Sequence, residues 1–167
     1  TKYISQYLKS NLEKVGTIFT ILNIFTFISG LVISSFVIIF SPSISEFLNE
    51  PELCFSIKFG GLLLFFSIVN GCYNGSMLGY ENFKALAINT FASSLIEAVF
   101  VIAGAYYGGR VGALIGYGIG IMSLTVFNRL SVRKLFKASG VKANYSNLHI
   151  GDFKVLYQFS LPAALSS

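Results

Sequence analysis

Residues 15–40 read VGTIFTILNIFTFISGLVISSFVIIF and contain no charged side chain. A helix of about 20 apolar residues crosses the ~30 Å hydrocarbon core of a bilayer, so this stretch can span a membrane with some tilt. Three further stretches are also long and apolar, namely residues 59–79, residues 85–109 and residues 111–128. The second of these is interrupted by one charged residue, Glu97. A fifth begins near Val155. The sequence therefore predicts an all-α membrane protein with four complete transmembrane helices and the start of a fifth.

The composition excludes an ordinary water-soluble domain. Only 11% of the residues are charged, 54% are hydrophobic and the mean hydropathy is +0.71, whereas soluble domains carry about 25% charged residues. The alternative, buried helices of a large soluble protein, would require four wholly apolar helices in one short chain. The net charge of +5 is better explained by membrane topology than by nucleic-acid binding.

Basic residues predict the orientation, because Lys and Arg concentrate on the cytoplasmic side. The N-terminal segment contains Lys2, Lys9 and Lys14, and residues 129–154 are also basic. The expected loop of residues 41–57 carries three glutamates and neither Lys nor Arg. We therefore expect a multi-pass protein of the bacterial inner membrane with both ends of this chain cytoplasmic and the acidic loop outside.

The same features suggest the domain organisation. Residues 1–130 are expected to form part of an N-terminal helical bundle, which begins with an amphipathic interfacial segment over residues 3–12 or with the solvated start of the first span. Residues 131–154 are expected to be a cytoplasmic basic linker, and residues 155–167 to begin a second bundle. The chain starts at Thr1 and stops within an apolar run, so we expect it to be an excerpt of a longer protein.

Enzyme and metal motifs are missing from the sequence. There is no phosphate-binding loop, no G-x-S-x-G, no HExxH and no metal-ligand spacing, and His149 is the only histidine. Cys54 and Cys72 would lie roughly 27 Å apart along a helix, which is beyond the ~7 Å that a disulfide allows between Cα atoms. We therefore expect that this segment does not hydrolyse ATP and needs no cofactor and no metal; an intramembrane enzyme would need catalytic residues outside this chain.

Small residues recur at four-residue spacing in two of the predicted spans. Such ridges let helix backbones approach closely in a membrane. They are Gly71, Gly75 and Gly79 in the second span, and Gly112, Gly116 and Gly120 in the fourth. The segment of residues 106–110, YYGGR, predicts a tight hairpin between the third and fourth spans.

Polar side chains form stripes on the first three predicted spans, at helical spacing. Lipid-facing polar groups are costly, so the stripes should turn toward the interior of the bundle. Interhelical hydrogen bonds, worth ~0.6 kcal/mol each on average, are one explanation; a water-filled cavity explains three coordinated stripes better. The candidates for a substrate or coupling-ion pathway are Asn23, Asn70, Asn74, Asn89, Ser93 and Glu97.

Glu97 is the sharpest of these features. It lies 13 residues from both Lys84 and Arg110, roughly 20 Å from either end of its helix. An acidic side chain at such a depth costs at least ~2.5–3.5 kcal/mol to insert. It could serve as a proton or cation relay, or as a structural carboxylate paired with an Arg or Asn on a helix outside this chain. Both interpretations remain open from the sequence.

Several motifs resemble one family. Residues 71–87, GCYNGSMLGYENFKALA, closely resemble the G-x-L-x-G-x-E-x-F-K-x-x-A signature of polysaccharide-biosynthesis flippases, which include the O-antigen flippases of the multidrug/oligosaccharidyl-lipid/polysaccharide exporter superfamily. Residues 106–116, YYGGRVGALIG, are similar to the family's hairpin, and residues 159–162, FSLP, are similar to the opening of its second half. Glu97 matches no residue of the family pattern.

The resemblance implies helices three to six of a first bundle and the start of helix seven. It also implies that the chain is a fragment of a two-bundle transporter fold, and that the protein is a transporter and not an enzyme. The implied activity is that of a flippase, which moves an undecaprenyl-diphosphate-linked oligosaccharide from the inner to the outer leaflet by alternating access. The partners expected are this lipid-linked substrate, H+ or Na+ as coupling ion, membrane lipid and other surface-polysaccharide assembly proteins, with no nucleic acid. A drug/cation antiporter of the same superfamily is the alternative; a membrane glycosyltransferase would need larger outer loops.

Overall fold

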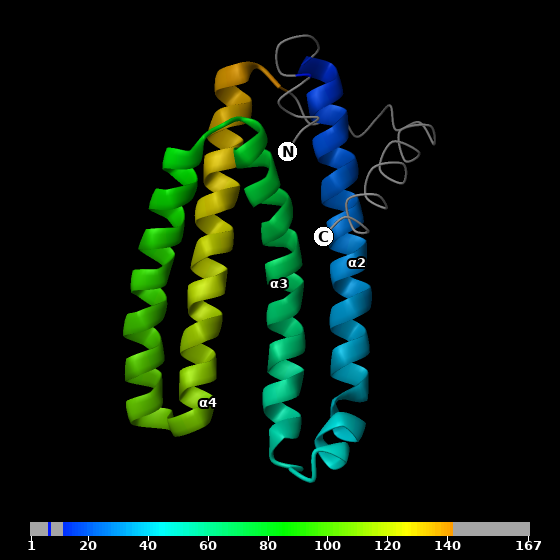
Figure 1. The fold of residues 1–167 in the computed structure, drawn as a ribbon, viewed down its shortest axis with the longest axis vertical. Helices are drawn as coiled ribbons and strands as arrows, with labels where there is room; N and C mark the ends of the chain where they lie inside the picture. Colours follow the sequence, from blue (N-terminus) through cyan, green and yellow to red (C-terminus); the bar gives the residue numbers. More distant parts are fainter. Residues whose placement is uncertain (1–6, 8–11, 142–167) are drawn as a thin grey trace, which may run out of the picture.

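The computed structural model describes Tyr7 and residues 12–141, and this part of the chain is helical throughout apart from short turns. It contains α2 (Leu12–Phe47), α3 (Leu53–Gly79) and α4 (Phe83–Ser139), which lie side by side (Figure 1). All three are long and apolar enough to cross a membrane. The fifth apolar stretch and most of the amphipathic segment expected near the N-terminus lie outside the described residues.

α4 is folded back on itself at Gly109. A straight helix of its 57 residues would be about 86 Å long, far more than a bilayer requires. Gly109 has φ 55° and ψ −138°, which are not helical angles, and only glycine reaches such a conformation without strain. We call residues 83–108 the first arm and residues 110–139 the second arm. The arms run antiparallel (Figure 1), with the reversal inside the hairpin expected for residues 106–110.

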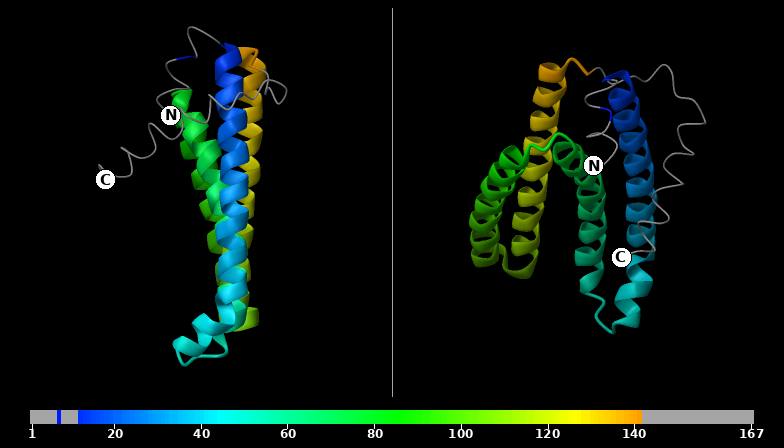
Figure 2. Two further views of the ribbon diagram at one scale, coloured as in Figure 1. Left: turned by 90° about the vertical axis from the view of Figure 1, so that its right-hand side faces the viewer. Right: turned by 45° about the horizontal axis from the view of Figure 1, so that its top comes forward.

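The turn between α2 and α3 is shorter than the loop of residues 41–57 that the sequence predicted. α2 continues through Pro42 to Phe47, and α3 begins at Leu53. Pro42 has no N–H to donate to the carbonyl of Ile38, but Ser41 Oγ donates to that oxygen at 2.7 Å. The last turns of α2 bend aside (Figure 2). Of the three glutamates of the expected loop, Glu46 thus lies inside α2, and Glu50 and Glu52 lie in the short turn between the helices.

The expected linker of residues 131–154 is helical in its first part. The second arm continues without interruption to Ser139 and ends at Gly140, which has φ 72° and whose N–H donates to the Phe136 carbonyl. A left-handed glycine at this position is the commonest way to end a helix. Residues 142–154 lie outside the described part of the chain.

An apolar cluster joins all three helices near the start of α2. The rings of Phe19 and Phe136 meet edge to face with centroids 4.6 Å apart, and Met77 is fully buried between them and their neighbours. The buried members of the cluster are Val15, Phe19, Cys72, Tyr73, Met77, Val132, Phe136 and Val141. This end of the bundle is therefore the best-packed part of the structure that is described.

The opposite end carries the two remaining turns. Arg110 Nη2, just after the reversal of α4, lies 3.3 Å from Glu52 Oε2, just before α3. Both side chains are exposed, at 58% and 82%, so the pair contributes little to stability. The pair nevertheless shows that the acidic turn and the α4 hairpin lie at the same end of the bundle (Figure 1).

The glycine ridges of the second arm and of α3 differ in the helices that they contact. In the second arm, a Cβ on Gly112 or Gly116 would collide with the backbone of the first arm at Gly104 or Phe100, and a Cβ on Gly120 would lie 2.5 Å from Glu97 Cβ. The arms therefore pack backbone to backbone along this ridge.

The second ridge, in α3, makes no such contact. A Cβ on Gly71 or Gly75 would meet no atom within 4 Å among the described residues. The side of α3 that carries these two glycines faces neither α2 nor α4, so their expected role in helix packing stays a prediction. Gly79, the last residue of α3, is buried. The close approach between α2 and α3 occurs at Gly61 instead, where a Cβ would lie 2.9 Å from Ile38 Cγ1.

Candidate functional site

Four asparagines from three helical segments meet inside the bundle. Asn128 of the second arm donates from Nδ2 to Asn70 Oδ1 at 2.8 Å and to Asn74 Oδ1 at 2.7 Å, both on α3. Asn89 of the first arm donates from Nδ2 to Asn128 Oδ1 at 2.9 Å and to Ser131 Oγ at 2.9 Å. We call these five residues the amide cluster. It ties α3 to both arms of α4.

Asn128 is the centre of the amide cluster and is fully buried. Its amide can donate two hydrogen bonds and accept two, and three of these are made within the cluster. Within the described range no buried side-chain nitrogen or oxygen lacks a partner. The side chains of the amide cluster thus bond to one another, and the water-filled cavity expected between the stripes stays a prediction.

The geometry of the arms explains why these residues meet. The glycine ridge sets the register of the two arms, with Phe100 opposite Gly116 and Glu97 opposite Gly120. Continuing that antiparallel register brings Asn89 opposite Asn128. The cluster is therefore a consequence of the reversal at Gly109 and of the small residues that follow it.

Asn128 and Ser131 are the members that sequence reasoning missed. Asn128 directly precedes Arg129 and is the last residue of the predicted fourth span. Ser131 is the first residue of the predicted linker. A usable signal was present, since Asn128 follows Gly120 by eight residues and so lies near the same side of the helix.

Glu97 lies apart from the amide cluster. It is partly buried, and its side chain lies against Gly120 of the second arm, with Oε2 2.8 Å from where a Cβ of that residue would stand. It makes no hydrogen bond or ion pair with any residue described by the structure. The structural carboxylate pairing considered from the sequence involves a helix outside this chain, so it stays a prediction.

The remaining candidates, Asn23 and Ser93, are not brought together with the others. Ser93 is buried and donates to the carbonyl of Thr90 on its own helix at 2.9 Å. The Asn23 side chain on α2 is partly buried and makes no hydrogen bond with the residues described. A different polar contact joins α2 to α3, where Ser34 Oγ donates to the Gly61 carbonyl at 2.6 Å.

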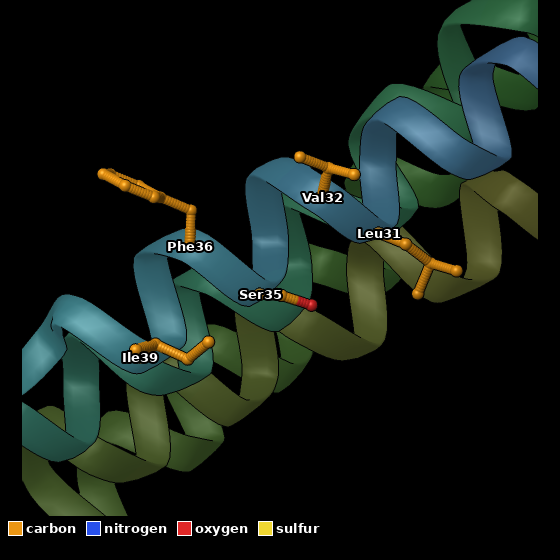
Figure 3. A pocket seen from close by; sticks show the side chains of 5 residues that line it. All are labelled: Leu31, Val32, Ser35, Phe36 and Ile39. Atoms are coloured by element: carbon orange, nitrogen blue, oxygen red, sulfur yellow. The ribbon is translucent and has the colours of Figure 1, made fainter.

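The hollow drawn in Figure 3 is a shallow surface feature and not a binding cavity. Its lining residues all come from one helix, α2, and their side chains point away from the bundle (Figure 3). Four of the five are apolar and exposed. The lining residues are Leu31, Val32, Ser35, Phe36 and Ile39. Such a face suits contact with lipid or with other helices.

A further polar contact fixes the end of the bundle at the apolar cluster. The hydroxyls of Tyr80, at the end of α3, and Ser139, at the end of α4, lie 3.1 Å apart. Burial raises the pKa of Tyr80 above its ordinary value of 10.0, although the hydrogen bond to Ser139 opposes the rise. The phenol therefore remains un-ionised at neutral pH and can donate to Ser139.

No group of three His, Cys, Asp or Glu side chains that could hold a metal is found among the described residues. Cys54 and Cys72 are both free thiols. The chemistry that the interior offers is thus hydrogen bonding by amides and hydroxyls, with one carboxylate at Glu97.

Comparison with known proteins identifies the family. A family described as polysaccharide biosynthesis protein matches residues 3–162, nearly the whole chain. The chain belongs to this polysaccharide biosynthesis protein family. No curated protein and no solved structure matches it.

Family membership gives the site its setting. The matched range includes α2, α3, both arms of α4, the amide cluster and Glu97. Members of the polysaccharide biosynthesis protein family have a membrane-associated role in polysaccharide synthesis, and the three long apolar helices agree with that setting. A lipid-linked sugar substrate and contact with membrane lipid are consistent with it.

Proposed function

We propose that this chain is part of a flippase that moves an undecaprenyl-diphosphate-linked oligosaccharide from the inner to the outer leaflet of a bacterial inner membrane. The match to the polysaccharide biosynthesis protein family over residues 3–162 carries the proposal. Sugars assembled on a lipid carrier inside the cell need a route across the membrane. The long apolar helices with polar interiors supply the kind of scaffold that such a route requires.

The proposal includes a topology of four crossings. α2, α3 and the two arms of α4 would each cross once, with the apolar cluster at the cytoplasmic end and the Glu52–Arg110 pair outside. The exposed basic residues near the apolar cluster support this orientation, because Lys and Arg favour the cytoplasmic side. They are Lys84, Arg129, Arg133, Lys134 and Lys137.

Alternating access needs helices that shift as units. The amide cluster and the glycine ridge bind α3 to the arms of α4, and α2 is bound to the same block by its close approach to α3 at Gly61 and by the apolar cluster. In the proposed mechanism this block moves as a rigid body against other helices of the protein, and the substrate's sugar passes along the polar side.

Glu97 is proposed to take part in coupling. It is a mid-span carboxylate without a partner in the described residues, and intramembrane carboxylates commonly serve ion or proton relays. The same observation favours the second candidate, a drug/cation antiporter, because a carboxylate suits a cationic substrate. H+ or Na+ would be the coupling ion in either case.

Loss of the gene distinguishes the two candidates. For a flippase we expect lipid-linked oligosaccharide to accumulate on the inner leaflet and surface glycan to be lost, with unchanged drug resistance. Drug sensitivity with normal surface glycan would instead establish the antiporter and overturn the flippase proposal.

The role of Glu97 is tested by Glu97→Gln, which keeps the packing against Gly120 and removes the charge. We expect transport of the lipid-linked sugar to fall at least tenfold while the amount of folded protein in the membrane stays normal. Ser94→Ala, an exposed polar position on the same arm, is the matched control and should transport normally. Normal transport by Glu97→Gln would remove this residue from the mechanism.

A further inference from the structure

One side of the second arm changes from apolar to basic along its length. Spacings of seven, four, three, four and four residues keep its members on one side of the helix. The apolar members are 41% to 53% exposed, and the basic members are also exposed. They are Ile115, Met122, Val126, Arg129, Arg133 and Lys137. We call this the apolar-to-basic face.

The packing of the arm fixes this face outward. Val132 and Phe136, on the other side of the same turns, are 3% and 9% exposed and belong to the apolar cluster. Because these two side chains are held inside, Arg129, Arg133 and Lys137 must project away from the bundle. None of the three makes a hydrogen bond or ion pair with a described residue, and residues 111–141 contain no Asp or Glu.

The change from apolar to basic residues falls where the helix would leave the hydrocarbon core of a bilayer. Residues 111–128 carry no charge and span about 27 Å, close to the ~30 Å hydrocarbon thickness. Arg129 then lies at the hydrocarbon boundary, and Arg133 follows about 6 Å further along, within the headgroup layer of roughly 5–7 Å on each side. Lys137 lies about 12 Å beyond Arg129, just outside that layer, where screening still permits attraction.

We propose that the apolar-to-basic face is a docking surface for anionic phospholipid of the cytoplasmic leaflet. Acyl chains would lie along Ile115, Met122 and Val126, and phosphate headgroups would meet the two arginines and Lys137. The positive charges are spread along the helix and do not converge on one point, which fits several bilayer headgroups better than a single diphosphate. Basic side chains near the membrane surface attract anionic lipid strongly enough to change binding about fivefold each.

The test uses the purified full-length protein and native mass spectrometry. Phosphatidylglycerol and phosphatidylcholine with identical acyl chains are titrated, and the dissociation constants of the first bound lipids are compared. We expect the unaltered protein to prefer phosphatidylglycerol, and R129Q/R133Q/K137Q to lose at least tenfold of that preference. R129K/R133K, which keeps the charges, should retain it, and thermal unfolding in detergent verifies that each variant is folded.

A single-charge control separates a site from diffuse charge. Lys58→Gln removes one exposed positive charge at the other end of the bundle, and should leave the preference unchanged, whereas Arg133→Gln should weaken it about fivefold. An unchanged preference in the triple variant, or an equal loss in Lys58→Gln, would overturn the proposal. Undecaprenyl diphosphate displacing phosphatidylglycerol at equal concentration would overturn it too, by assigning the face to a prenyl diphosphate.

Discussion

At the scale of single residues, Asn128 decides how the interior is held together. It contacts α3 twice and the first arm of α4 once, always through a side-chain amide or carboxamide oxygen. Within a membrane interhelical hydrogen bonds average ~0.6 kcal/mol, so the three together are worth about 2 kcal/mol. In this structure Asn128 therefore has a structural role. If Asn128 were to bind a substrate during transport, these hydrogen bonds would first have to break.

We therefore expect Asn128→Ala to lower the free energy of unfolding by about 2 kcal/mol, measured by titrating the folded protein with sodium dodecyl sulfate in mixed micelles. Asn23→Ala is the matched control, because Asn23 also lies in an apolar helix but makes no hydrogen bond with the described residues; it should change stability by less than about 0.5 kcal/mol. Equal effects of the two substitutions would show that the amide cluster does not stabilise the bundle.

The sequence predicted part of this site for a physical reason. A polar side chain in an apolar stretch must find a partner, which singled out Asn70, Asn74 and Asn89. It did not indicate which partners they would find, because that depends on the register between the arms. The register follows from the exact position of the reversal, Gly109, and from backbone contacts between the arms. These contacts cannot be predicted from the pattern of polar and apolar residues.

At the scale of the helices, the glycine ridge of the second arm allows the two arms of α4 to pack closely. Gly116 lies against the carbonyl of Phe100, with no room for a side chain. The equally spaced Gly71 and Gly75 of α3 have open space around them. Spacing alone therefore predicts that a helix can be approached closely and does not reveal which helix approaches it.

We expect Gly116→Ala to push the arms of α4 apart and to lower the free energy of unfolding by about 1–3 kcal/mol, the usual cost of overpacking. Gly71→Ala meets no neighbour among the described residues and replaces a poor helix former, so it should be neutral or should stabilise by up to about 1 kcal/mol. The same detergent titration measures both. Similar losses for the two variants would contradict the arrangement of the arms.

The helix bounds were predicted less well than their existence. Apolar length identifies what lies in the membrane, but helices continue beyond it wherever backbone groups can be satisfied. α2 passes Pro42 because Ser41 replaces the missing donor, and the second arm passes Arg129 because Val132 and Phe136 pack into the apolar cluster. The first extension depends on a local hydrogen bond, and the second depends on contacts between segments far apart in the sequence.

At the scale of the whole molecule, the structure assigns each turn to an end of the bundle. The α2–α3 turn and the α4 hairpin share one end, while the α3–α4 turn and the end of α4 share the other (Figure 1). Single cysteines in a background without the native thiols should therefore label in pairs with an impermeant maleimide. Positions 47 and 107 should react from one side of sealed vesicles, and positions 81 and 137 only from the other.

These four positions carry exposed side chains, so accessibility depends on the side of the membrane and not on burial. Permeabilised vesicles provide the control in which all four react. Reaction of positions 47 and 137 from the same side would contradict the arrangement. Which pair reacts in intact cells decides the orientation proposed for the bundle.

The reversal at Gly109 has one more consequence. The two arms of α4 are connected there by a single exposed peptide segment, yet they adhere along the whole glycine ridge and through Asn89 and Asn128. The covalent link thus contributes little to keeping the arms together. The protein could be produced as two separate polypeptides divided between Gly108 and Gly109, and the halves would find each other within the bilayer.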